Sequence, residues 1–123
     1  MGNFKKHFDL AKEKLDATIT AYKNKQNTVV GDLAVKVVEQ FVEADASKDN
    51  KHFGAHKERH AYCNKNFTSD INESMRKIWF AYGDLGYDGV NGHRAKRVME
   101  NLKIIIDFFQ ERFNEKIEPK INI

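Results

Sequence analysis

Hydrophobic residues recur at spacings of three and four through the first 46 residues, the spacing that lines one face of an α-helix. The pattern predicts a first helix over residues 4–25 and a second helix that ends near Ala46. Polar residues 24–28 are typical of a short connection between two helices. The apolar positions are Phe4, Phe8, Ala11, Leu15, Thr18, Ile19 and Tyr22, followed by Val30, Leu33, Ala34, Val37, Val38, Phe41 and Val42.

The regular pattern is interrupted after the second helix. Residues 45–51 are polar and favour turns, and the segment that follows is rich in His and Lys, with weaker apolar periodicity. We therefore expect a loop followed by a short helix from about His56 to Asn66.

A third long helix is predicted after this short one. Asp70 and Glu73 have the spacing of a capping box, in which each side chain bonds the other residue's backbone amide at a helix start. The helix is expected to end at Gly83 or Gly86, because glycine tolerates the left-handed conformation that closes many helices. Its apolar face consists of Ile71, Met75, Ile78, Trp79 and Tyr82.

The last predicted helix carries the clearest apolar stripe of the chain. It is expected to begin near Asn91 or Gly92 and to reach about Lys116. The stripe is wide enough to serve both an internal core and a contact between two subunits. It consists of Ala95, Val98, Met99, Leu102, Ile105, Ile106, Phe109 and Phe113.

Together with these elements, length and composition predict a fold class. The 123 residues suffice for one domain, and 41% of them are hydrophobic, enough to fill a core. The single proline, Pro119, leaves residues 1–118 without a proline break, which favours long helices. We expect one all-α domain over residues 1–123, an antiparallel up-and-down bundle of four to five helices.

The same counts indicate a compartment. The single cysteine cannot form an internal disulfide, so we expect a cytoplasmic protein. The aliphatic run 104–106 is far shorter than a membrane span, and residues 1–6 lack the apolar segment of a secretory signal. A net charge of +3 permits only weak attraction to phosphate backbones. We expect no membrane partner.

Four side chains of metal-binding type fall within about 80° on one face at helical spacing. They are His52, His56, His60 and Cys63. Imidazole and thiolate suit zinc, which makes His56, His60 and Cys63 candidate ligands. Three histidines in a row on a helix span about 12 Å, so only neighbouring ones can share an ion. A full site would need ligands from elsewhere, such as His7 or His93 if the fold brings them near. The alternative is that these side chains are structural or solvated.

A glycine-rich loop is predicted between the last two helices, over residues 83–92. It does not fit a calcium loop, because Gly86 and Ala95 fall where the third and twelfth ligands belong. It also lacks the phosphate-cradling glycine patterns. Tyr87, Asp88 and Asn91 are candidate binding residues, since binding residues often lie in loops. The alternative is a tight connection only.

Basic residues open the last helix, where the positive end of the helix dipole makes them unfavourable unless anions are near. We expect His93, Arg94 and Lys96 to face Lys57 and Arg59 across the fold. Together they are candidates for binding a phosphate or carboxylate. The alternative is an ordinary solvated face.

These features resemble a known family. Residues 30–36, the histidine-rich segment 52–60 and the loop 85–92 with the following Arg94-Ala95-Lys96 are similar to small archaeal HEPN-like proteins related to the PaREP1 group. The resemblance covers residues 4–113. It implies a compact antiparallel helical bundle that often forms homodimers. The superfamily includes RNA-cleaving toxins, nucleotide-binding modules and partners of minimal nucleotidyltransferases.

Ribonuclease members of that family carry an arginine and, four to six residues later, a histidine. No arginine in this chain has that spacing. The leading hypothesis is therefore a non-catalytic, dimeric binding module for an anionic ligand, nucleotide or RNA, or for a protein partner of nucleotidyltransferase type. The alternative is a ribonuclease that uses His60 with Arg59 or Arg94. The third hypothesis is a zinc-binding helical protein.

Overall fold

The structure, a computed structural model, describes residues 3–84 and 93–122. Within these two ranges the chain forms five helices and no strand, so the predicted all-helical class is confirmed. The helices are α1 (Phe4–Lys23), α2 (Asn27–Ser47), α3 (His56–Asn66), α4 (Ser69–Asp84) and α5 (His93–Phe113). The predicted residues Tyr87, Asp88 and Asn91 lie outside the described residues.

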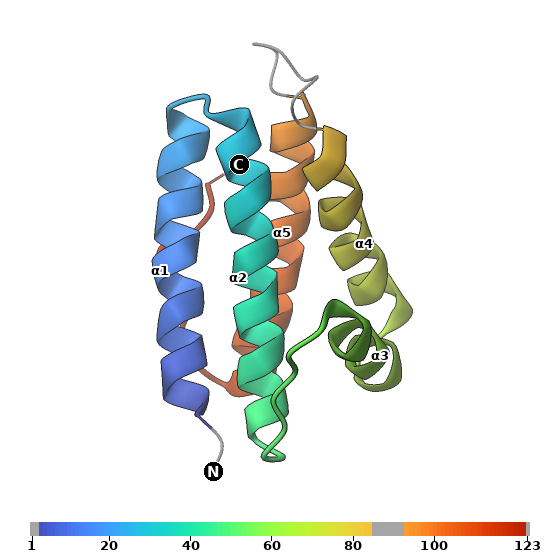
Figure 1. Ribbon diagram of the computed structural model, residues 1–123. Coiled ribbons are helices and arrows are strands. Elements are labelled where there is room, and N and C mark those ends of the chain that lie inside the picture. The colour runs from blue at the N-terminus through green and yellow to red at the C-terminus, as the bar shows by residue number, and fades with distance from the viewer. Residues whose placement is uncertain (1–2, 85–92, 123) are drawn as a thin grey trace.

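Helix α2 lies at the centre of the bundle. Figure 1 shows α1 and α2 side by side and running in opposite directions, joined by a short turn at the top of the view. Helix α2 packs against α1, α4 and α5, and the short α3 lies near its lower end. Because other elements cover α2 on several sides, every residue from 41 to 47 is buried.

Phenylalanine rings at predicted stripe positions contact one another within the core. Phe41 of α2 stacks on Phe109 of α5 with ring centroids 5.4 Å apart, and Phe109 stacks on Phe113 at 5.2 Å. Phe8 of α1 meets Phe41 edge to face at 6.2 Å. Aromatic pairs in such geometries add to the free energy of apolar burial, so these contacts join α1, α2 and α5.

Two predicted helix ends are wrong by a few residues. Helix α4 begins at Ser69, so Asp70 lies in its first turn and is not the N-cap residue. A hydrogen bond from the Thr68 side chain lowers the pKa of the Asp70 carboxyl. Helix α5 ends at Phe113, because Asn114 has a positive φ of 53°, the left-handed conformation that closes helices.

The segment after α5 returns along the bundle as irregular chain. Figure 1 shows it passing behind α1 toward the top of the view. Ile117 and Ile121 belong to the hydrophobic core. A search of the described residues finds no helix with the length and apolar character that crossing a bilayer requires.

Candidate functional site

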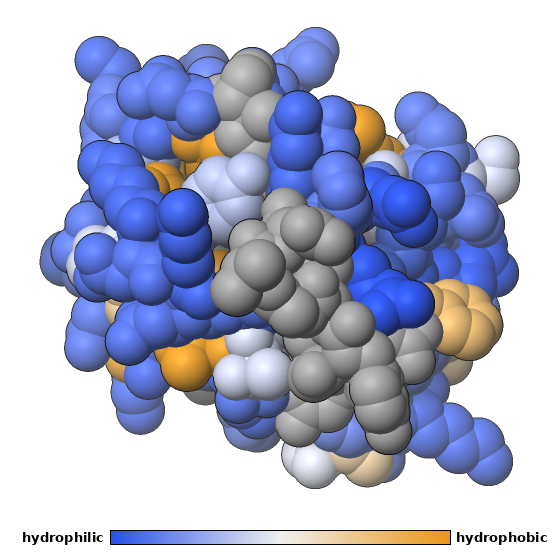
Figure 2. Space-filling model, turned by 90° about the horizontal axis from the view of Figure 1, so that it is seen from above, coloured by the Kyte–Doolittle hydropathy of each residue, from blue (hydrophilic) through white to orange (hydrophobic). Residues whose placement is uncertain are grey.

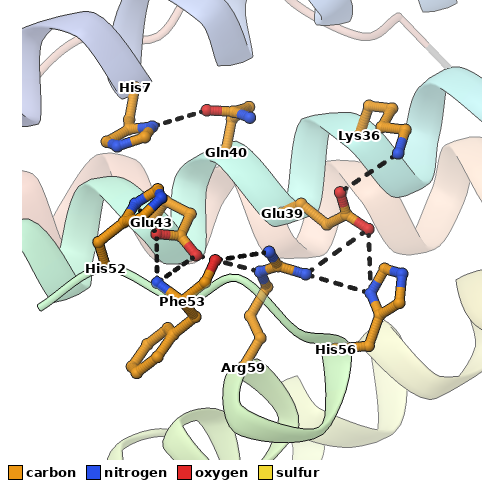
Figure 3. A network of polar contacts seen from close by, with 9 residues as sticks. All are labelled: His7, Lys36, Glu39, Gln40, Glu43, His52, Phe53, His56 and Arg59. Carbon is orange, nitrogen blue, oxygen red and sulfur yellow. Dashed lines mark hydrogen bonds and ion pairs between the residues drawn. The ribbon is translucent and has the colours of Figure 1, made fainter.

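Two buried glutamates on α2 form the centre of the candidate site. Glu39 and Glu43 are four residues apart, so they lie on the same face of the helix, and they are only 6% and 2% exposed. Segment 52–59 lies over this face (Figure 3). Burying a carboxylate is costly unless cations and hydrogen-bond donors compensate for the lost water.

A single arginine of α3 serves both carboxylates. Figure 3 shows the guanidinium of Arg59 between them: its Nε lies 3.3 Å from Glu43 Oε1 and its Nη1 lies 3.8 Å from Glu39 Oε1. Its Nη2 donates to the carbonyl oxygen of Phe53 at 3.3 Å. The arginine therefore ties the start of α3 and the loop before it to α2.

Glu43 has a complete set of partners. The backbone N–H of Phe53 lies 3.2 Å from each carboxylate oxygen, and Arg59 donates to Oε1. His52 Nδ1 lies 3.0 Å from Oε2. Both oxygens thus receive donors, which fixes the orientation of this buried carboxylate.

Glu39 is less well satisfied. Lys36 Nζ lies 3.6 Å from Oε2. His56 Nδ1 lies 3.3 Å from Oε1, but the same nitrogen is 3.1 Å from Arg59 Nη1, whose hydrogen it accepts. A ring nitrogen that accepts a hydrogen bond has no proton to donate. Glu39 Oε1 is consequently buried without a hydrogen-bond partner.

A cavity of about 290 Å³ adjoins this carboxylate between α2, α3 and α4. Its walls are Asp32, Val35, Lys36, Glu39, His56 and Trp79. The ring of Trp79 meets the rings of His56 and His60 edge to face, with centroids 6.3 and 5.1 Å apart. The cavity thus combines carboxylates with an aromatic side chain.

The structure shows how the zinc ligands predicted on α3 lie relative to one another. The rings of His56 and His60 are 6.5 Å apart at their centroids. Cys63 is buried, and that burial raises the pKa of its thiol to about 12, so the thiol stays protonated at neutral pH. Among the described residues, the group with three candidate ligand atoms within 4.8 Å of one another is instead His7, Glu43 and His52.

His60, the candidate catalytic residue, lies at the surface of α3 beside Trp79. Partial burial lowers the pKa of His60, and the nearby His56 and Arg59 lower it further. His60 also lines a second cavity, of about 340 Å³, together with Cys63 and Trp79.

The basic residues expected to form one anion site lie at opposite ends of the bundle. Lys57 and Arg59 are on α3, at the lower end in Figure 1, whereas His93, Arg94 and Lys96 open α5 at the upper end. Figure 2 looks onto that upper end, where hydrophilic residues cover most of the described surface in view. Lys57 is exposed, whereas Arg59 is held by the two glutamates.

A second buried carboxylate, Asp45, also joins α2 to other helices. Tyr62 of α3 donates its hydroxyl hydrogen to Asp45 Oδ2 at 2.6 Å. Arg112 of α5 donates through Nε to Oδ1 and through Nη2 to Oδ2, the latter at 3.2 Å. Burial raises the pKa of Tyr62, and the hydrogen bond to Asp45 raises it further.

Sequence reasoning missed Glu39, Glu43 and Asp45. An available signal was their position among Val37, Val38, Phe41 and Val42, in a helix with apolar residues on more than one face. A charged residue within such a helix has little solvated face to occupy. The acids of α2 were therefore recognisable as candidates for burial.

Comparison with protein-family models, curated proteins and solved structures found no match for this chain. The basis for a functional inference is therefore the site itself. Its most informative atom is Glu39 Oε1, because a buried polar atom without a partner is rare in folded proteins.

Proposed function

We propose that the protein is a non-catalytic binding module whose cavity between α2, α3 and α4 takes a small organic cation, with a primary ammonium or guanidinium group. The observation that carries this proposal is the unsatisfied Glu39 Oε1 beside that cavity. A cationic N–H donor would supply what this oxygen lacks, and hydrogen bonds to charged groups are stronger than those between neutral ones.

The charges around the cavity favour a cation over an anion. Among the residues that line the cavity, Asp32 and Glu39 contribute two negative charges and Lys36 contributes one positive charge. One added positive charge would balance this group. Trp79 adds an aromatic wall, and a cation against an indole ring gains about 0.5–2 kcal/mol.

Lys36 already contacts the carboxylate that the ligand would bind. Its ammonium lies 3.6 Å from Glu39 Oε2, and its side chain is 57% exposed. An exposed lysine in a single ion pair contributes little to stability and moves aside at small cost. The ligand cation would donate to Oε1, and the ammonium of Lys36 competes with it for the same carboxylate.

Other parts of the sequence-based hypothesis stay predictions: the HEPN-like identity with its up-and-down topology, the homodimer, the anionic ligand and the nucleotidyltransferase-type partner. For RNA cleavage, Arg59 would have to bind phosphate beside His60. Its guanidinium already donates to Glu43 and Phe53 and lies against Glu39. That engagement supports a binding role over a ribonuclease.

The fluorescence of Trp79 reports directly on this cavity, because it is the single tryptophan of the chain. We would titrate the protein with N-butylguanidine and with N-butylurea, which has the same shape and no charge. The guanidine is expected to cause a saturable change, and the urea none. A saturable response to both, or to neither, would contradict the proposal.

Substitutions then assign the response to the carboxylate. Glu39→Gln is expected to weaken guanidine binding about tenfold, the equivalent of one charge-assisted hydrogen bond. Lys36→Met is expected to strengthen binding, because it removes the competing ammonium. Asp16→Asn, which removes an exposed acid on α1, is the matched control and should change nothing. Equal affinity in wild type and Glu39→Gln would refute the site.

A further inference from the structure

A second group of side chains lies on the other side of the polar network. His7 comes from α1, Glu43 from α2 and His52 from the segment between α2 and α3. One candidate ligand atom from each lies within 4.8 Å of the other two. We propose that His7, Glu43 and His52 bind one divalent transition-metal ion of the zinc class.

The donor atoms and their spacing suit such an ion. Two imidazoles and one carboxylate are a common set of three protein ligands for zinc. With metal–ligand distances of about 2.1 Å, tetrahedral neighbours lie about 3.4 Å apart. His52 Nδ1 and Glu43 Oε2 are already 3.0 Å apart, and the rings of His7 and His52 are stacked at 5.6 Å. Small side-chain rotations would complete the geometry.

The surroundings of His7 prepare it as a ligand. Its Nδ1 lies 2.8 Å from the side-chain oxygen of Gln40, which can only accept a hydrogen bond. In the neutral tautomer whose Nδ1 donates this hydrogen bond, Nε2 keeps a free lone pair. Metal-binding histidines typically have one such hydrogen bond at the other ring nitrogen, which fixes the ring's orientation and tautomer. Gln40 would thus be a positioning residue.

Glu43 is held in the same way. Arg59 Nε donates to Oε1, and the Phe53 N–H contacts both oxygens, so the buried carboxylate cannot turn freely. Oε2 faces His52. A metal ion would bind Oε2 of Glu43 and Nδ1 of His52, and the imidazole would then carry its one proton on Nε2.

The site is accessible from one side. The side chain of His52 is 71% exposed, whereas that of Glu43 is 3% exposed. His7 and His52 also line a cavity of about 250 Å³. Three protein ligands with adjoining space leave room for a water molecule as the fourth ligand. The proposal is independent of the cation cavity beside Trp79, which uses other residues.

The test is calorimetric titration of untagged, chelator-treated protein with Zn²⁺, supported by the visible absorption of tetrahedral Co²⁺. We expect one ion per chain. His7→Ala and His52→Ala should each weaken binding at least about tenfold and abolish the Co²⁺ spectrum. Because His52 is exposed, its substitution should leave the core intact. The helical content and the unfolding midpoint of each variant check that it is folded. Gln40→Leu should weaken binding and retain one ion per chain.

Substitution of two other histidines provides matched controls. His60→Ala and His93→Ala should bind Zn²⁺ as the wild type does. If the wild type binds no ion, or if His52→Ala and His7→Ala bind as tightly as wild type, the proposal is overturned. Loss of binding in His60→Ala would overturn it as well, because the ion would then lie on α3. Titration with N-butylguanidine contains no metal, so the two proposals fail separately.

Discussion

Two buried acidic clusters attach α3 to the centre of the bundle, and they differ in how fully their carboxylates are satisfied. In one, the single carboxylate of Asp45 is matched by the single guanidinium of Arg112 and by the hydroxyl of Tyr62. In the other, Glu39 and Glu43 share Arg59, and one oxygen of Glu39 has no donor. We call the first cluster balanced, because both oxygens of Asp45 have donors, and the second unbalanced, because one oxygen of Glu39 has none.

The difference separates a structural role from a binding role. A buried carboxylate with one charge partner and complete hydrogen bonds has nothing further to offer a ligand. In the other cluster, Glu39 keeps a buried oxygen without a hydrogen-bond donor, and histidines and cavities lie at both ends of the cluster. The balanced cluster therefore joins helices α2, α3 and α5, while both proposed sites adjoin the unbalanced one.

The largest effect is expected from removing the shared cation. Arg59→Met leaves two buried carboxylates without it and should lower the free energy of unfolding by about 3 kcal/mol, as measured by urea denaturation. Lys57→Met, which removes a neighbouring exposed cation, is the matched control and should cost less than about 0.5 kcal/mol. Equal small losses in both variants would show that Arg59 is not needed to balance the glutamates.

A smaller effect compares the two clusters directly. Asp45→Asn keeps the shape of the side chain but removes the charge, and should cost about 2 kcal/mol, since it weakens charge-assisted hydrogen bonds. Glu39→Gln should change stability by less than about 0.5 kcal/mol, because Arg59 keeps Glu43 as its partner. Urea denaturation of both variants measures the change in the free energy of unfolding. If Glu39→Gln costs as much as Asp45→Asn, the comparison of the clusters fails.

At neutral pH the smallest effect is expected at Cys63, which directly follows Tyr62 on α3. Burial raises its thiol pKa from 9.0 to about 12 in the folded state. The unfolded chain therefore loses this proton first as the pH rises, so stability should fall between about pH 9 and pH 12. Cys63→Ala should make the alkaline decline in unfolding midpoint shallower, whatever its effect at pH 7. An unchanged alkaline slope would contradict the buried thiol.

Much of the fold could be predicted because periodicity is a local property. The spacing of Phe8, Ala11 and Leu15 on α1, and of Val98, Leu102 and Ile105 on α5, records which face of each helix is buried. The short helix His56–Asn66 was also predicted at its observed bounds. The burial of the segment after α5 was not predicted. Ile117 and Ile121 are not part of a helical stripe, and their burial depends on where the chain returns along the bundle.

The candidate site was predicted only in part. The segment around His52 and His56 was recognised as unusual from its composition, and it does line both proposed sites. Arg59 was assigned to an anion site, because a sequence does not show that two carboxylates of α2 face it. Acids four residues apart on a helix are usually solvated, and the signal for the burial of Glu39 and Glu43 was their position among the apolar residues of α2.

By itself, the sequence determined the elements: helical periodicity, the absence of proline before residue 119 and enough apolar side chains for one core. Only the tertiary structure decided which polar groups lose their water. Segment 52–59 folds over α2 and buries Glu39 and Glu43, and α1 brings His7 to His52 across 45 residues of sequence. A buried charge is costly unless it has a partner, and here the partners come from residues that are distant in sequence. The proposed functions therefore depend on contacts that the sequence does not show.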